Sequence, residues 1–91
     1  MSAQVNTYSS TWFKNYTSLG SDVDLLADGP DPVHKRYPCR RIVPGSTGNL
    51  VLVQMDGTSR TLPVTSGEVL DVQAKTITAS GTTVTSAKVY W

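Results

Sequence analysis

Short runs of β-branched and aromatic residues, separated by turn residues, dominate the chain from residue 36 onward. These runs cover residues 36–43, 49–54, 60–64, 68–79 and 82–90, and each is rich in Val, Ile, Leu, Thr or Tyr. Such residues favour strands, and five runs so close together leave no room for helices. The pattern therefore predicts an all-β fold.

The segments between these runs carry the residues that tight turns require. Gly45-Ser46-Thr47-Gly48 follows a proline, Asp56-Gly57 separates two apolar runs, and Ser66-Gly67 and Ser80-Gly81 mark two further reversals. An Asp-Gly pair readily adopts the positive backbone angles of a tight hairpin. We expect a meander of antiparallel hairpins, folded into a small antiparallel β-sandwich or a partly open barrel.

Periodicity assigns places to some of these strands. Residues 50–53 are apolar on both faces, which is typical of a central strand covered by the second sheet and by a neighbouring subunit or the N-terminal segment. Pro63 cannot donate to a β-ladder, so its strand is predicted to lie at an edge. Within 68–79, Leu70 and Ile77 fall on opposite faces, which indicates a bulge or a bend.

The first part of the chain differs in character from the rest. Residues 1–30 are polar with scattered aromatics, and we expect them to form an extended N-terminal arm and linker, with residues 31–91 as the β-sandwich domain. Four large side chains recur at close to helical spacing, namely Tyr8, Trp12, Tyr16 and Leu19. The many Ser, Thr and Asn residues between them favour turns or extended chain instead, so a helical arm remains an alternative.

Composition narrows the range of partners. The chain has 91 residues with 8 Lys and Arg against 7 Asp and Glu, a formal charge of +1 that produces no strong field toward nucleic acid or an anionic membrane. The basic clusters at 34–36 and 40–41 are more typical of a strand rim or an interface ion-pair set. No stretch is long and apolar enough to cross a bilayer, and the first residues do not resemble a signal peptide. A domain of this size buries a small core, so support from a partner or from self-association is expected.

The sequence offers little chemistry. Cys39 is the only cysteine, which excludes an internal disulfide and a paired-thiolate zinc site. A nucleophile-elbow motif and phosphate-binding glycine loops are absent. Four aspartates have ligand-like spacing but lack the closing glutamate of a calcium loop, and two prolines interrupt them. We therefore expect no catalytic residue, no cofactor and no metal site, and a protein that is not an enzyme.

Several short motifs from residue 40 onward resemble one family. An arginine-containing strand, Arg41-Ile42-Val43, leads into a glycine-rich turn and Gly48-Asn49-Leu50, followed by Asp56-Gly57-Thr58, Gly67-Glu68-Val69-Leu70 and Ser80-Gly81-Thr82-Thr83. The last turn has Ser where the family pattern has Thr. This order resembles the small β-proteins of tailed-phage and gene-transfer-agent structural modules, notably the head-spike base family of capsid decoration proteins.

The resemblance implies a virion structural protein on the capsid surface, assembled in the host cytoplasm. Such a subunit would dock on the major capsid protein, self-associate as a trimer or pentamer about a symmetry axis, and could hold a separate spike or fibre protein, with no direct contact to nucleic acid or membrane. Aromatic anchors and rim cations are the expected contact groups. The candidate partner-binding residues are Tyr8, Trp12, Phe13, Tyr16, Arg36, Arg40 and Arg41.

Alternative functions remain open at this stage. Trp12 and Phe13 have an equally simple interpretation as a cover for the chain's own sandwich. Aromatic rings on a sheet face also occur in carbohydrate-binding and host-adhesion modules, and Tyr90 with Trp91 would serve that purpose if both were exposed on one face. A tail or neck assembly component shares the all-β construction and differs only in its partner.

Overall fold

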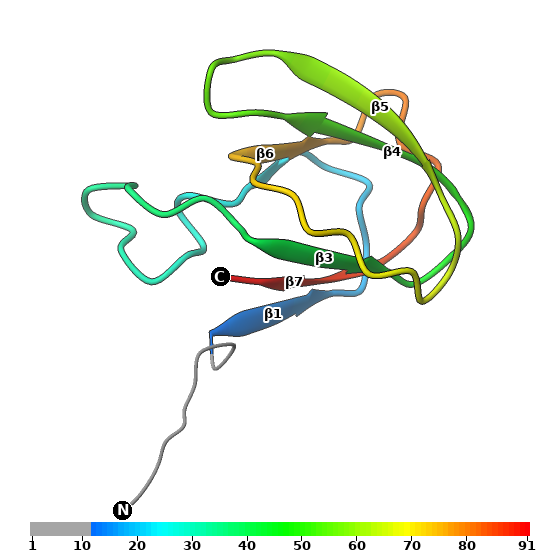
Figure 1. Cartoon of the computed structure of the whole chain (residues 1–91), viewed down its shortest axis with the longest axis horizontal. Coiled ribbons are helices and arrows are strands. Elements are labelled where there is room, and N and C mark those ends of the chain that lie inside the picture. Colours follow the sequence, from blue (N-terminus) through cyan, green and yellow to red (C-terminus); the bar gives the residue numbers. More distant parts are fainter. Residues whose placement is uncertain (1–11) are drawn as a thin grey trace, which may run out of the picture.

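The computed structural model describes residues 12–91, which form seven strands and no helix (Figure 1). None of these residues therefore forms a helix that could cross a membrane. The strands are β1 (Phe13–Tyr16), β2 (Val23–Asp24), β3 (Arg41–Pro44), β4 (Gly48–Val53), β5 (Ser59–Val64), β6 (Thr76–Thr78) and β7 (Ala87–Tyr90). The expected all-β fold is confirmed.

The strands form two antiparallel sheets that face each other across one apolar core (Figure 1). One sheet has the order β1-β7-β3, and the other has the order β2-β6-β4-β5. Ile42 and Val89 from the first sheet and Leu50 and Ile77 from the second are fully buried between them. This arrangement is a small antiparallel β-sandwich, as predicted, but the predicted meander is wrong, because β4 and β5 are the only consecutive strands that pair within residues 12–91.

The β4–β5 hairpin follows the sequence closely. Gly57 has a φ of 88°, and the Asp56 carboxylate accepts a hydrogen bond from the backbone N–H of Thr58 at 2.9 Å. That bond holds the pKa of Asp56 below its usual value. Pro63 lies in β5, which is the last strand of its sheet, so its predicted edge position is confirmed.

The centre of β4 is covered on both faces, as its apolar run predicted. Leu50 and Leu52 point into the core, and Val51 is buried on the opposite face. The turn before β7 supplies that second cover, because Gly81 lies so close that a Cβ there would be 3.1 Å from the Val51 side chain. The Thr82 hydroxyl also accepts a hydrogen bond from the Val51 N–H at 2.9 Å. Neither a neighbouring subunit nor the N-terminal segment is needed for this cover.

Two segments predicted as long strands instead cross from one sheet to the other. Leu70 exchanges backbone hydrogen bonds with Ile42 of β3, both at 2.9 Å, whereas Thr76–Thr78 belongs to the second sheet. Thr83 donates to the Asn49 carbonyl beside β4, whereas Ala87–Tyr90 joins the first sheet. The bend predicted within 68–79 is confirmed, and the strands are shorter than predicted because each crossing interrupts the ladder.

The position of the N-terminal segment requires a correction. Phe13–Tyr16 pairs with β7 and Val23–Asp24 pairs with β6, so both are strands of the sandwich. Tyr16, Leu19 and Leu25 are buried in the core. From residue 13 to the end of β2, the chain is thus neither helical nor a separate arm, because its apolar side chains complete the core. Tyr8 lies outside the described residues.

Burial makes Cys39 a structural residue. Its side chain is fully buried, and this burial raises the pKa of the thiol to about 11. Since the thiolate is the reactive form, we expect an aromatic disulfide reagent at pH 8 to label the folded protein far more slowly than the denatured protein. Equal labelling rates, followed by absorbance with and without denaturant, would contradict this expectation.

Candidate functional site

Alternation along β7 sorts the candidate residues onto two faces of the first sheet. Ala87, Val89 and Trp91 are buried on the inner face, whereas Lys88 and Tyr90 point outward. Cross-strand partners share a face, so the register of β1 and β3 against β7 extends this division to their side chains. The candidate residues therefore fall into an inner group and an outer group.

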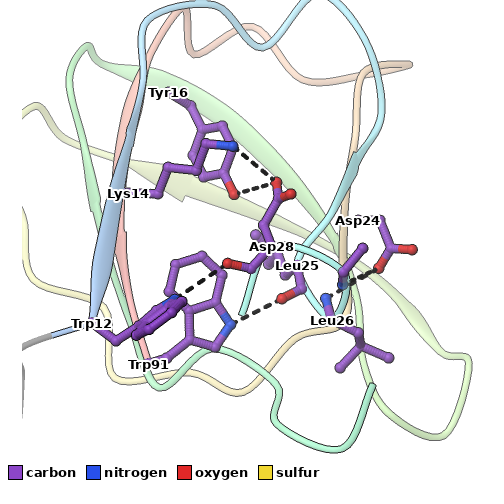
Figure 2. Close-up of polar contacts among 9 residues, drawn as sticks. Trp12, Lys14, Tyr16, Asp24, Leu25, Leu26, Asp28 and Trp91 are labelled. Atoms are coloured by element: carbon purple, nitrogen blue, oxygen red, sulfur yellow. Dashed lines mark hydrogen bonds and ion pairs between the residues drawn. The ribbon is translucent and has the colours of Figure 1, made fainter. Parts of the chain in front are cut away.

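The inner group anchors the loop that follows β2 (Figure 2). The Trp91 indole N–H donates to the Leu25 carbonyl at 2.9 Å, and the Trp12 indole N–H donates to the Asp28 carbonyl at 3.3 Å. A Cβ on Gly29 would lie only 2.7 Å from the Trp91 nitrogen, so this position requires glycine. Trp12, directly before β1, and Trp91, directly after β7, thus hold one loop against the end of the sheet.

The Asp28 carboxylate contacts two side chains of β1. The Tyr16 hydroxyl donates to the Asp28 carboxylate at 2.7 Å, and the Lys14 ammonium lies 3.6 Å from the same oxygen (Figure 2). Burial, reinforced by the bond to Asp28, raises the pKa of Tyr16 well above its usual value, so the phenol stays protonated and remains a donor. Tyr16 is 8% exposed, which places this predicted partner-binding residue in the core.

Asp24 fixes the start of the same loop. Its carboxylate accepts hydrogen bonds from the backbone N–H groups of Leu26 and Ala27, at 3.1 and 3.2 Å, and lies 3.3 Å from the Lys35 ammonium. Burial opposes ionisation of Asp24, but these bonds and the lysine outweigh it and lower its pKa. The aspartates therefore organise backbone turns. Within residues 12–91, no cluster of three or more His, Cys, Asp or Glu side chains is arranged to hold a metal.

The outer group forms an exposed aromatic and basic surface. Phe13 is 55% exposed, its ring centroid lies 5.6 Å from that of Tyr90, and Arg41 lies opposite Tyr90 on the other neighbouring strand. In the next row of the sheet, Asn15 and Val43 flank Lys88. We call these six residues the outer face: Phe13, Asn15, Arg41, Val43, Lys88 and Tyr90.

The outer face is not flat. Asn15, Val43 and Lys88 also line a shallow depression of about 250 Å³ that extends toward Gly45 and Gly67. The Arg41 guanidinium donates to the Asp71 carboxylate at 3.0 Å; the Arg41 side chain is half exposed and that of Asp71 is largely in solvent. Exposed pairs of this kind contribute little to stability, so they leave Arg41 available for an exchange of partners.

The other predicted cations lie apart from this surface. Arg36 belongs to the loop between β2 and β3, which projects from one end of the sandwich (Figure 1), and it binds Asp31 at 2.8 Å. His34 contacts the same carboxylate through its backbone N–H and its ring. The Arg40 guanidinium lies 3.5 Å from the Trp91 carbonyl, at the edge of the inner group.

Of the predicted partner-binding residues that the structure describes, Phe13 and Arg41 lie together on the outer face, whereas Trp12 and Tyr16 meet at Asp28 in the inner group. Lys88 and Tyr90 also lie on the outer face, and Lys88 was not among the predicted residues. The sequence does indicate that Lys88 points to solvent, because a lysine between two small apolar residues is typical of the exposed side of a half-buried strand. Tyr90 and Trp91 lie on opposite faces, so they do not form the shared aromatic platform on which the carbohydrate-binding alternative depends.

Comparison with known proteins gives one informative result. No family model and no curated protein matches the chain. The chain is similar to a chain of a solved structure described as "Capsid of native GTA particle computed with C5 symmetry", where GTA denotes gene transfer agent. The two chains share 26% identity over 84% of this chain and 80% of the other, with a TM-score of 0.59. This likeness in sequence and fold supports a structural protein of a phage or gene-transfer-agent virion.

Proposed function

We propose that this chain is a capsid decoration or spike-anchoring subunit that docks on the major capsid protein. The observation that carries the proposal is the likeness, over most of both chains, to a chain of a gene-transfer-agent capsid structure. The proposed role is structural and non-enzymatic. Its site is the outside of the capsid, where the subunit would either cover the surface or hold a separate spike or fibre protein.

The described surface suits this role. The outer face offers an aromatic pair, the exposed Phe13 and the half-buried Tyr90, beside the cations Arg41 and Lys88. Aromatic and arginine side chains are enriched among the residues that contribute most to protein interfaces. A small subunit with one modest interface gains avidity when several copies bind a repeating lattice together. The symmetry of the similar structure makes a pentamer the first oligomer to test, with a trimer as the next.

The docking proposal can be tested with particles assembled in a host that lacks this gene. Purified chain is added to such particles, and binding is measured by co-sedimentation and then by electron cryomicroscopy. We expect saturable binding and added density on the outer capsid surface. Absence of binding, or density confined to the tail or neck, would overturn the docking proposal.

Self-association is a separate expectation with its own measurement. Light scattering on the purified chain is expected to give the mass of a trimer or a pentamer. A monomer at all accessible concentrations would overturn self-association in solution while leaving docking on the capsid intact, because the lattice alone would then arrange the copies.

A further inference from the structure

We propose that β1 accepts an extended acidic segment of a capsid subunit as an additional strand, beside the outer face. The inference rests on the proposed function and specifies how the docking would occur. Strand addition of this kind uses backbone hydrogen bonds for affinity and neighbouring side chains for selectivity. It requires an open sheet edge, a surface that selects the incoming strand, and a reason why a second copy of this chain does not occupy the edge.

Among residues 12–91, no strand pairs with the outer edge of β1. Trp91 donates its backbone N–H to the Trp12 carbonyl at 2.9 Å, which fixes the direction of the ladder between β1 and β7. Hydrogen bonding alternates along an antiparallel pair, so Lys14 and Tyr16 also bond to β7. The backbone groups of Phe13 and Asn15 point the other way, where no strand of the described chain pairs with them. Two donors and two acceptors thus line this edge.

The other strand edges within residues 12–91 are less open. The outer edge of β3 is occupied at Ile42, which exchanges hydrogen bonds with Leu70. β5 carries Pro63, which has no N–H to offer, and β2 is only two residues long. Prolines and very short strands are common means of blocking unwanted strand addition. No such feature protects β1 in the described chain.

A second copy is a poor occupant for this edge. A ring built through sheet edges needs a second open edge on each subunit, and β5 and β3 do not provide one. A two-fold pair through β1 would place two basic outer faces side by side, since Arg41 and Lys88 lie on the same face of the sheet. Like charges brought together at an interface oppose association.

The charge of the outer face selects an acidic partner. Lys88 forms no ion pair within residues 12–91, and Arg41 is paired only with Asp71, whose side chain is 72% exposed. An added strand would lie about 10 Å from β7, a gap that a lysine and a glutamate side chain can bridge together. Apolar residues of the same strand would extend the stack of Phe13 on Tyr90.

Hydrogen exchange is the direct test, because it reports the two outward amides separately from their neighbours. The labelled chain is exchanged free and bound to particles that lack it, then dissociated and read amide by amide by nuclear magnetic resonance. We expect exchange at Phe13 and Asn15 to slow by about tenfold or more on binding, with little change at Lys14 and Tyr16. Bound chain whose Phe13 and Asn15 amides exchange as in the free protein would overturn strand addition and leave the docking function standing.

Matched variants separate the backbone and charge contributions. Asn15→Pro removes an N–H that points outward from the edge of β1. Thr61→Pro is its control on the edge of β5. Pro63 has no N–H to donate to β4, so the N–H of Thr61, two residues earlier in the same strand, also points away from β4. Lys88→Glu reverses a charge on the outer face. Arg60→Glu is its control, because it makes the same charge reversal in β5 of the other sheet. We expect at least tenfold weaker particle binding for the Asn15 and Lys88 variants only.

Circular dichroism establishes that each variant is folded, and Lys88→Glu keeps the test decisive if the proline variant unfolds. Equal binding by Lys88→Glu and Arg60→Glu would overturn the acidic partner. If the wild-type chain also fails to bind particles, the result contradicts the docking function on which this inference rests.

Discussion

A chain that begins at Gly29 is expected to be unfolded, whereas a chain that begins at Trp12 keeps the sandwich. The shorter chain lacks β1 and β2 and the buried side chains of Tyr16, Leu19 and Leu25. Truncation of one buried large side chain costs about 2–5 kcal/mol, and the whole stability of a small domain is about 5–15 kcal/mol. Loss of three such side chains therefore removes most or all of the net stability.

Circular dichroism and proton spectra of the two truncated chains measure this difference. We expect the chain from Trp12 to show a cooperative thermal transition and dispersed amide signals, and the chain from Gly29 to show neither. A cooperative transition for the chain from Gly29 would mean that residues 31–91 fold alone, as the change in sequence character suggested. The described contacts of β1 and β2 would then be dispensable.

Replacement of Trp91 by alanine is expected to be among the most damaging single substitutions. The indole is 6% exposed, packs over Gly29 and donates to the Leu25 carbonyl at 2.9 Å. Loss of a buried tryptophan costs about 3–5 kcal/mol through lost contacts and the cavity that remains. The variant also leaves the Leu25 carbonyl without its donor in a buried place. Chemical denaturation measures the change in the free energy of unfolding.

Trp91→Phe is the matched control, because it keeps most of the ring and removes the N–H donor. We expect it to lose about 1–3 kcal/mol, the usual cost of an unsatisfied buried acceptor plus a small loss of volume. Tyr90→Ala on the opposite face should cost less than Trp91→Ala. Equal effects of the two alanine variants would contradict the assignment of these neighbours to the inner and outer faces.

Local sequence signals predicted the parts of the fold that stay within one sheet. The Asp56-Gly57 pair specified the β4–β5 hairpin, and Pro63 specified its edge. Where the chain crosses between sheets, the signal fails for a physical reason. Val84 and Ala87 are both buried although they are three positions apart, because the first belongs beside β4 and the second lies in β7. Alternation with a period of two predicts one continuous strand, so it does not detect a segment that crosses from one sheet to the other.

The candidate site was harder to predict because its decisive contacts join distant residues. The inward positions of β1 are Lys14 and Tyr16, with Trp12 directly before the strand, and the lysine obscures the apolar alternation. That lysine is tolerated on the inner face since it lies at the sheet edge and reaches Asp28. The aromatic spacing therefore resembled one side of a helix. The division of Tyr90 from Trp91 follows from the strand pattern of β7 alone and was accessible from the sequence.

The pairing of β1 with β7 has a consequence for how the protein is made. These strands are far apart in the sequence, so the three-stranded sheet cannot form on the ribosome until Ala87–Tyr90 has emerged. Contacts between such distant residues also slow the search for the native pairing. Until β7 arrives, the edge of β1 and the apolar residues behind it are unpaired and open to association with other nascent chains. The sandwich is therefore expected to form only after β7 has been synthesised, and incorporation into a particle has to wait for that step.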